Sequence, residues 1–553
     1  VLTSVEKNGL YLDREFNNQL LETYKPKIDA ARQAIYDLPR VKKFEKKYNQ
    51  EKIDKYIQSI EAELEELDYN DPKDKRKIVS REQKISNIKA GIFTTKKEQE
   101  LIRPINLGSS VDLPALMYSE EGFHFEVIKN NESGKPSTDE ETLTNLRLTV
   151  KKPDSPKAIF LDRLLELRGL EKMYKTYIEG WNEKVQDDDR LHGRFLIHGT
   201  TSGRLSSAEP NAQQIPKTSV DPNIKLQLKA PKGTLYIASD FSQAELRIMA
   251  HLSGDETYLN AFNSGQDPHL AIAATKYHIP YEEALKIYED ENHPEHKIWK
   301  VRRKQAKQIA FGLIYGIGAK LLAVKLSDPK SGIIVTPEEA QKEMDIFFGQ
   351  HPKLKTFLKK QEKFLRKNGH LVSLFGRKRR LPQIYSNDKG EEAYALRLAL
   401  NFPCQSAASD MCLFGSILIY YLMRQGKLPS TKSVCLVHDA NYQITKPENI
   451  NIWSIYEMWQ IYRNPLTKPY FGFQIDDVTM DMEFVIGRSM AEELPFIPGY
   501  DYKKMLEPDF SVEEYMEEHK KYKHIPISEY KKRFNKQMKQ YEKDFERTHS
   551  MEG

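Results

Sequence analysis

The sequence predicts an α+β fold in which long helical segments surround a few short apolar strands. Three observations support this class. Apolar residues recur at helical spacing over residues 1 to about 190, on a background rich in Lys and Glu. Short strand-like runs follow at 194–198, 235–238 and 433–437. Helical segments return between residue 256 and about 395, punctuated by Pro and Gly.

Length and charge set the broad limits. The chain has 553 residues, which is too long for one hydrophobic core, so several domains are expected. Lys and Arg total 85 against 80 Asp and Glu, and the net charge of +5 neither requires nor excludes a nucleic-acid partner. The apolar stretch Leu413–Met423 is too short to span a bilayer. It predicts a buried helix, and no membrane contact is expected.

The three cysteines predict neither a zinc site nor a disulfide. Cys404, Cys412 and Cys435 form no CxxC pair and have no accompanying His cluster. We expect buried, inert thiols in a reducing compartment, which favours the cytoplasm, or the host cytoplasm if the protein is viral.

The two ends of the chain are predicted to be helical and strongly polar. Near the N-terminus, one apolar stripe on a charged background predicts a solvated helical hairpin (Ile53, Ile57, Ile60, Leu64, Leu67). Residues 129–137 are rich in turn formers, and Thr138–Glu141 then opens a helix with a capping-type start. The stretch from Ser511 is charged and helical in pattern, without a clear apolar face.

Two aspartates follow apolar runs that read as strands. Asp240 comes after Leu235–Ala238, and Asp439 comes after Ser433–Val437, before a second short strand at 442–444. Two strand-end carboxylates on adjacent strands could hold two Mg²⁺ ions, which prefer oxygen ligands. Either aspartate alone is as well explained as a turn residue.

The segment Arg302–Gly316 reads as a helix with an unusual face. Arg303, Lys307, Phe311 and Tyr315 recur at steps of four, so they stay near one side over about 18 Å. Cations at one end suit a polyphosphate, and rings at the other suit a base. A solvated basic stripe followed by a buried aromatic stripe explains the composition, but not why both share one face.

Other phosphate-binding signals are weaker. No GxxxxGK[ST] segment is present, which disfavours an ordinary P-loop ATPase. The basic run Arg377–Arg380 lies between Phe375-Gly376 and Leu381-Pro382, and a turn is predicted there. Phosphate contact and a solvated surface are about equally good explanations of this run.

Together these segments resemble the DNA polymerases of family A, the bacterial DNA polymerase I type and its phage relatives. Asp240–Arg247 is similar to motif A, Arg303–Gly316 to motif B and Val437–Asp439 to motif C. The segments that resemble the remaining family signatures occur in the family's order and cover most of the chain (Leu2–Asp13, Thr201–Ser207, Pro210–Pro216, Arg397–Gln405). The Lys-, Tyr- and Asn-rich composition and the His-Asp-Ala triplet at motif C favour a phage source.

The resemblance implies a right hand of thumb, palm and fingers, with an antiparallel palm sheet and mostly helical thumb and fingers. The expected thumb is 1–190, with an insertion. The palm is expected at 191–255 and 396–510, on either side of fingers at 256–395. The expected C-terminal extension is 511–553.

The resemblance also implies the role of each site residue. Asp240, Asp439 and Lys307 are the expected catalytic residues, and Asp240, Asp439 and the Phe241 carbonyl would bind two Mg²⁺ ions. The incoming dNTP is expected to contact one group of side chains (Gln243, Glu245, His269, Arg303, Lys307, Phe311, Tyr315). Primer–template DNA is expected to contact another (Arg204, Asn211, Gln213, Arg397, Asn401, Gln405, His438). The minor-groove part of these contacts would check pair geometry without reading sequence.

The implied activity is DNA-directed DNA synthesis, in which dNTPs are added to a primer 3′-hydroxyl. Two positions depart from the family pattern. Ala440 stands where Glu usually follows the motif C Asp, so a primer–template-binding protein with weakened chemistry is the alternative. Ala310 stands where Asn is common. A single-subunit RNA polymerase or reverse transcriptase is disfavoured by Glu245, whose bulk would meet a 2′-hydroxyl.

Two expectations concern what accompanies the polymerase. The family's proofreading exonuclease precedes the thumb, so none is expected within these 553 residues. The helical insertion near residues 42 to 95 could bind a processivity factor or another replication protein, and a lengthened thumb explains it equally well.

Overall fold

The structure is a computed structural model that describes residues 1–327, 335–463 and 467–521. The chain forms two compact units. One contains Leu21–Thr176, and the other contains Val1–Leu20 together with Tyr177–Gly553. Helix α2 (Arg14–Tyr36) runs from one unit into the other.

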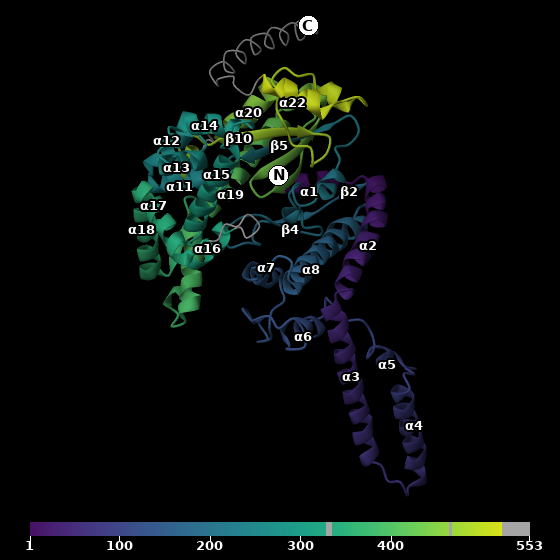
Figure 1. The fold of residues 1–553 in the computed structure, drawn as a ribbon. Helices are drawn as coiled ribbons and strands as arrows, with labels where there is room; N and C mark the ends of the chain where they lie inside the picture. The colour runs from purple at the N-terminus through teal and green to yellow at the C-terminus, as the bar shows by residue number, and fades with distance from the viewer. Residues whose placement is uncertain (328–334, 464–466, 522–553) are drawn as a thin grey trace. The chain divides into compact units, whose positions relative to one another are not determined.

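The Leu21–Thr176 unit is helical. Its long helices α3 (Pro39–Glu65) and α4 (Pro72–Lys89) form an antiparallel hairpin (Figure 1). The hairpin is held by an apolar stripe on an otherwise exposed surface (Ile57, Ile60, Leu64, Ile78, Ile85, Ile88), as the sequence predicted. The short helix α5 (Lys96–Gln99) contacts the hairpin through the ion pair of Glu98 with Lys84 of α4 at 3.3 Å. The remaining helices pack around a separate core: α6 (Asp112–Tyr118), α7 (Glu140–Thr149) and α8 (Pro156–Lys172).

The second unit is built on a five-stranded antiparallel sheet with strand order β11-β10-β5-β9-β8. The central strand β5 (Leu235–Phe241) pairs with β9 (Ala440–Thr445) on one side and with β10 (Met482–Gly487) on the other. The edge strands are β8 (Lys432–Val437) and β11 (Leu494–Pro495). Three two-stranded sheets complete the strands (β1 Leu10–Tyr11 with β2 Arg190–Leu191; β3 Arg194–Leu196 with β4 Ser206–Ala208; β6 His370–Val372 with β7 Lys378–Arg380).

Helices surround this sheet and extend away from it. The 36-residue helix α19 (Lys389–Arg424) and helix α15 (His296–Ile314) carry most of the predicted site residues that lie on helices. The other helices of this unit are α1 (Leu2–Asn8), α9 (Gly180–Asn182), α10 (Pro222–Leu226), α11 (Ala244–Ser253), α12 (Glu256–Asn263), α13 (Pro268–Lys276), α14 (Tyr281–Glu289), α16 (Ala319–Leu326), α17 (Pro337–Gln350), α18 (Pro352–Asn368), α20 (Ile452–Arg463), α21 (Lys468–Phe471) and α22 (Val512–Lys520).

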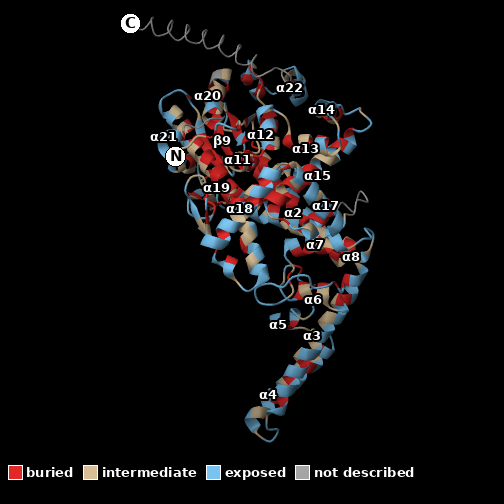
Figure 2. Ribbon diagram, turned by 90° about the vertical axis from the view of Figure 1, so that its left-hand side faces the viewer, coloured by how far each residue is buried: buried red, intermediate tan, exposed pale blue. Residues whose placement is uncertain are grey.

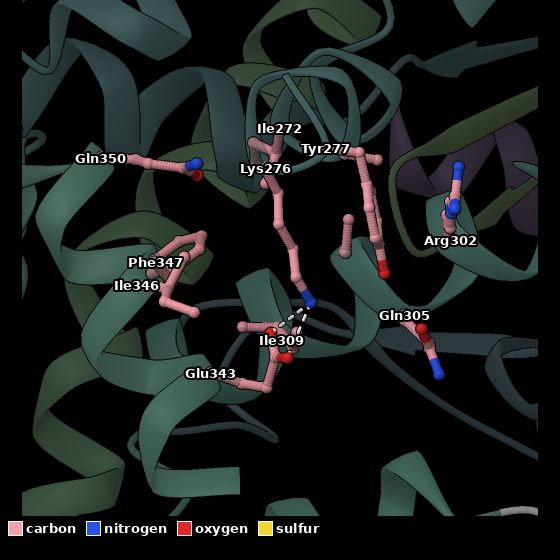
Figure 3. A pocket seen from close by; sticks show the side chains of 12 residues that line it. Ile272, Lys276, Tyr277, Arg302, Gln305, Ile309, Glu343, Ile346, Phe347 and Gln350 are labelled. Carbon is pink, nitrogen blue, oxygen red and sulfur yellow. Dashed lines mark hydrogen bonds and ion pairs between the residues drawn. The ribbon is translucent and has the colours of Figure 1, made fainter. Parts of the chain in front are cut away.

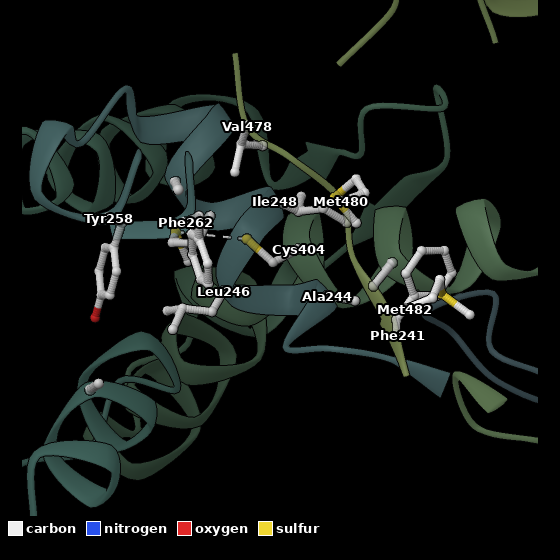
Figure 4. Packing of buried hydrophobic residues seen from close by; sticks show 14 of the residues in the cluster. Phe241, Ala244, Leu246, Ile248, Tyr258, Phe262, Cys404, Val478, Met480 and Met482 are labelled. Atoms are coloured by element: carbon white, nitrogen blue, oxygen red, sulfur yellow. Dashed lines mark hydrogen bonds between the residues drawn. The ribbon is translucent and has the colours of Figure 1, made fainter. Parts of the chain in front are cut away.

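One continuous apolar core fixes the sheet to its helices. Leu246 and Ile248 of α11 are fully buried, and they pack with Phe241 at the end of β5 and with Met480 and Met482 (Figure 4). The burial colouring shows the same concentration of buried residues around β9, α11 and α19 (Figure 2). The residues that follow Asp240 are therefore rigidly anchored.

The three cysteines are buried free thiols, as predicted. Burial raises the pKa of Cys435 to about 12 and raises the pKa values of Cys404 and Cys412 still further. The stretch Leu413–Met423 forms part of α19, as predicted. That helix is long and apolar enough by composition to cross a membrane, but half of its apolar window is buried in protein, as in an ordinary core helix.

Two local predictions were wrong. Within the basic run, only Arg377 lies in the turn, while Lys378–Arg380 forms strand β7, paired with His370–Val372. The C-terminal helix α22 does have a buried contact, since Tyr515 is 1% exposed and packs against Tyr500. The rest of the predicted extension, 522–553, lies outside the described residues.

Candidate active site

The two aspartates lie side by side on the central sheet. Asp240 is the penultimate residue of β5, and its register partner on β9 is Ala440. Asp439 is the neighbour of Ala440, in the two-residue turn between β8 and β9. Directly paired residues on antiparallel strands lie about 4.5–5.5 Å apart between Cα atoms. Both carboxylates line one open pocket of about 650 Å³, so the predicted convergence of the aspartates is confirmed.

Negative charge accumulates at this point. The Asp240 side chain is open to solvent on the pocket side, but the surrounding protein still desolvates it. This desolvation, with the charges of Asp439 and Glu483, raises the pKa of Asp240 to about 7. Glu483 is the register partner of Asp240 on β10, and Glu493 also lines the pocket. The sequence analysis missed both glutamates. No local pattern marks Glu483, because the register between β10 and β5 brings it opposite Asp240.

The carboxylates suit a hard divalent cation. The Asp439 Oδ1 atom is buried and has no hydrogen-bond partner, while Oδ2 lies 3.9 Å from the Arg204 guanidinium. An unpartnered anionic oxygen beside a second carboxylate is the donor set that Mg²⁺ accepts, with water filling the other positions. Among the described residues, no group of three or more His, Cys, Asp or Glu side chains is arranged to hold a metal ion. The site therefore offers two aspartates, with Glu483 nearby.

The facing wall comes from α15. Helix α15 ends at Ile314. Tyr315 therefore lies just beyond its last turn, and Gly316 follows at a φ of 69°. Phe311 and Tyr315 line the aspartate pocket. They also line an adjoining pocket of about 680 Å³ together with Lys307 and Arg397. Lys307, Phe311 and Tyr315 thus share a solvent-facing side, as predicted.

The first cation of this face already has a protein counter-ion. Arg303 donates to the Asp267 carboxylate at 2.6 Å. The other Asp267 oxygen accepts from the Leu270 backbone amide at 2.7 Å and so caps α13. His269 is 1% exposed, and neither of its ring nitrogens has a partner. Burial lowers the pKa of His269 to about 4, although Asp267 opposes the shift, so the ring is neutral near pH 7.

Glu245 connects the two walls. Its carboxylate accepts from Arg204 through one oxygen and from the Tyr315 hydroxyl through the other, the latter at 2.6 Å. Glu245 is 9% exposed and lines the aspartate pocket. Gln243, also a lining residue, has a left-handed backbone with φ 58°, which starts α11 directly after the strand. The sharp strand-to-helix turn brings Glu245 back over the aspartates.

The predicted DNA-contacting residues fall into two groups. Arg397, Asn401 and Gln405 recur at steps of four along α19, and Arg397 lines the pocket beside α15. Asn211 and Gln213 belong to a short 3-10 helix, Ala212–Gln214, of which Asn211 is the N-cap. Gln213 is 8% exposed, and its amide holds the β8–β9 turn, donating to the Leu436 carbonyl and accepting from the His438 backbone amide. Gln213 therefore positions His438 and Asp439, which the sequence analysis had not anticipated.

A separate pocket lies behind α15, between α13 and α17 (Figure 3). Lys276 crosses it and reaches both Glu343 oxygens at 2.7 Å, while Arg302 stacks over the Tyr277 ring at 3.9 Å. No predicted site residue lines this pocket. The contacts brace the back of the helix that presents Lys307 and Phe311 to the front.

Comparison with known proteins identifies the class. The family model for DNA polymerase family A matches residues 76–451, more than half of the chain. The chain belongs to DNA polymerase family A. It is similar to the thermostable DNA polymerase I of Thermus aquaticus, with 32% identity over 319 residues, covering 57% of this chain and 35% of that protein. It is also 32% identical over 336 residues to DNA polymerase I of Pseudomonas aeruginosa, covering 60% and 33% of the two proteins.

The fold agrees with this assignment. The polymerase domain of Pol1 from M. smegmatis, solved in complex with DNA primer-template and dNTP, superimposes with a TM-score of 0.63 at 24% identity. The match covers 89% of this chain and 69% of that one. The predicted α+β right-hand polymerase fold is confirmed. The matched region spans only about a third of the length of the curated relatives.

Proposed function

We propose that this chain catalyses template-directed addition of dNTPs to a primer 3′-hydroxyl. The observation that carries the proposal is the single pocket in which Asp240 and Asp439 face Phe311 and Tyr315. Carboxylates that hold divalent cations beside a cationic and aromatic helix face suit in-line attack on a nucleoside triphosphate. The structural neighbour bound to primer-template and dNTP supports the same function.

Asp240 and Asp439 would hold two Mg²⁺ ions, with the Phe241 carbonyl as a further ligand. Bound metal would supply activation of the attacking hydroxyl and stabilisation of the leaving oxygen. Glu483 and Glu493 add negative charge around Asp240. They leave the site anionic although Ala440 lacks the carboxylate that usually follows the motif C aspartate.

The side chains of α15 would then bind the nucleotide. The primer 3′-oxygen forms a bond to the α-phosphorus while the bond from that phosphorus to the pyrophosphate oxygen breaks. Lys307 would neutralise the phosphates and give a proton to the departing pyrophosphate. Arg303 would exchange part of its Asp267 contact for phosphate oxygens. His269, neutral at pH 7, would donate one hydrogen bond without adding charge.

Glu245 would select the sugar. It is fixed from both sides by Arg204 and Tyr315, so its carboxylate cannot easily move aside for a 2′-hydroxyl. Phe311 would stack on the incoming base, Tyr315 would guard the templating position, and Gln243 would contact the nucleotide. The primer–template would be contacted by Arg204, by the α19 series (Arg397, Asn401, Gln405) and by the segment around the motif C turn (Asn211, Gln213, His438).

A second candidate function is primer–template binding with weakened chemistry. One observation favours it: Ala440, paired directly with Asp240, is an apolar residue at the position where a carboxylate is usual. Against it, Asp240, Asp439, Arg303 and Lys307 all retain the expected chemical type, and the aspartates and Lys307 line the expected pockets.

Primer extension with Mg²⁺ separates the two functions. The chain and its Ala440→Glu variant are each given a labelled primer–template and dNTPs, and binding is measured on the same DNA by fluorescence anisotropy. Extension by the unmodified chain establishes synthesis. Binding without extension that Ala440→Glu restores establishes the weakened form. If neither protein incorporates a nucleotide, DNA synthesis is not the function.

A further inference from the structure

Asp240 is flanked on the central sheet by two positions of different chemistry. Its register partner on β9 is Ala440, and its register partner on β10 is Glu483. Directly paired residues of antiparallel strands place their side chains on the same face of a sheet. That face opens to the aspartate pocket, because Asp240 and Ala440 both line it. The row across the sheet therefore lacks a carboxylate on one side of Asp240 and has one on the other.

The Glu483 carboxylate has no cation of its own in the described part of the chain. It is exposed and forms no ion pair there. Like charges directly opposite each other on neighbouring strands are destabilising, so the pair of Asp240 and Glu483 costs stability in the free protein. Glu493, the other glutamate near Asp240, differs because it accepts from Lys225 at 2.8 Å. Of the two glutamates, Glu483 is the one whose charge is left for a bound cation.

Glu483 is better placed to act through water than as a direct metal ligand. Among the described residues, no three His, Cys, Asp or Glu side chains are arranged around one ion position. Mg²⁺ keeps several water molecules when only one or two carboxylates bind it. A carboxylate beside the ligands can accept hydrogen bonds from those waters, and loss of such an outer partner commonly weakens metal binding by about 10- to 100-fold.

We propose that Glu483 is a positioning residue that supplies, from β10, the metal-supporting carboxylate that Ala440 lacks on β9. The inference rests on the proposed function, in which Asp240 holds Mg²⁺. Glu483 would accept hydrogen bonds from water on the ion at Asp240, and its charge would strengthen the binding of that ion. A carboxylate at position 440 would support the same ion from the other side of Asp240. The chain can therefore keep its chemistry with alanine in motif C.

Manganese binding tests the proposal without requiring catalysis. Electron paramagnetic resonance measures free Mn²⁺ in the presence of the full chain and a primer–template whose primer ends in a dideoxynucleotide. The parent is compared with Glu483→Gln, which removes the charge and keeps the shape, and with Glu483→Asp, which keeps the charge. Glu448→Gln is the matched control. Glu448 is exposed in the short 3-10 helix Pro447–Asn449, which follows the end of β9 farthest from Ala440.

Glu483→Gln is expected to bind Mn²⁺ about tenfold more weakly than the parent, with Glu483→Asp between them and the control within about twofold. In primer extension, Glu483→Gln should need about tenfold more Mg²⁺ for the half-maximal rate and should approach the parent rate at saturating Mg²⁺. In EDTA its Tm should equal or exceed that of the parent, because a like-charge pair is relieved. A merely structural role would lower that Tm.

The double variant Ala440→Glu/Glu483→Gln tests whether the two positions serve one role. It should regain the Mn²⁺ affinity and the Mg²⁺ requirement of the parent to within about twofold, because a carboxylate again stands beside Asp240. Unchanged Mn²⁺ affinity in Glu483→Gln, or a loss that Ala440→Glu leaves uncorrected, overturns the proposal. A parent that binds Mn²⁺ but extends no primer refutes DNA synthesis instead.

Discussion

The two walls of the active-site pocket differ in how far neighbouring side chains neutralise their charges. On the sheet side, Asp240, Asp439 and Glu483 stand close together, and Asp439 Oδ1 has no partner in the described protein. On the helix side, Arg303 already has a carboxylate of its own at 2.6 Å. The sheet wall therefore carries negative charge that Arg204 compensates only in part, whereas the charge of Arg303 is neutralised within the protein.

This difference indicates what each wall requires from outside. Crowded carboxylates repel one another, and a divalent cation would relieve that repulsion, so we expect the sheet wall to require such a cation for catalysis. The Arg303 guanidinium is satisfied in the free protein, so a triphosphate must compete with Asp267 for it. We expect substitutions on the sheet wall to abolish catalysis and substitutions on the helix wall to tune nucleotide affinity.

The largest effect is expected for Asp439→Asn. The amide keeps the shape of the side chain but removes the charge that holds a cation, so the extension rate should fall on the order of 10³-fold or more. Rapid-quench primer extension measures it. Asp388→Asn, a matched change at the exposed N-cap of α19, should stay within twofold of the parent. Extension by Asp439→Asn at near the parent rate would remove the sheet wall from the chemistry.

Lys307→Ala should cost about 10²-fold in kcat, within the usual range for removal of a positioned general acid. The change also removes a cation from the pocket that Phe311 and Arg397 line, so the KM for dNTP should rise. Lys300→Ala is the control, because Lys300 is an exposed lysine of the same helix that lines neither pocket. A rise in KM alone, with kcat intact, would mean that Lys307 binds the phosphates but transfers no proton.

The parts of these walls that the sequence predicted are those carried by single elements. The step of four along α15 placed Lys307, Phe311 and Tyr315 on one face because helical geometry depends only on local spacing. The juxtaposition of Asp240 and Asp439 is the exception, since it joins two strands. It was predicted because each apolar run ends near an acid and because the resemblance to family A assigns both aspartates to one metal site. The fold class followed from the same patterns, read together with the family resemblance.

What escaped prediction depends on contacts between distant segments. Glu483 lies opposite Asp240 because β10 pairs with β5 in one register, and register is set by tertiary packing. The Gln213 amide reaches His438 across a separation of 225 residues along the chain. The basic run at 378–380 became strand β7 because His370–Val372 was available to pair with it. None of these partnerships has a local signature.

Asp267→Asn tests whether the Asp267 carboxylate competes with the nucleotide phosphates for Arg303. Asn still caps α13 but no longer presents a full charge to Arg303, so the guanidinium becomes more available to phosphate. The KM for dNTP should fall about threefold with kcat nearly unchanged, as expected when a competing charge-assisted hydrogen bond is weakened. Steady-state extension at several dNTP concentrations measures both constants. An increase in KM would mean that Asp267 holds Arg303 in place for the triphosphate and does not compete with it.

The smallest expected effect concerns His269 and the pH dependence of stability. Burial holds its pKa at about 4, below the ordinary value of 6.5. Between those values the unfolded chain binds a proton that the folded protein does not, so the free energy of unfolding decreases as the pH falls from 6.5 toward 4.

His269→Gln removes this contribution of His269 to the pH dependence of stability. Its decrease in Tm between about pH 7 and pH 5, followed by circular dichroism, should be smaller than that of the parent, and the same change at exposed His198 is the control. Parallel profiles for His269→Gln and the parent would show that His269 has the same pKa in the folded and the unfolded chain, which contradicts the effect of burial.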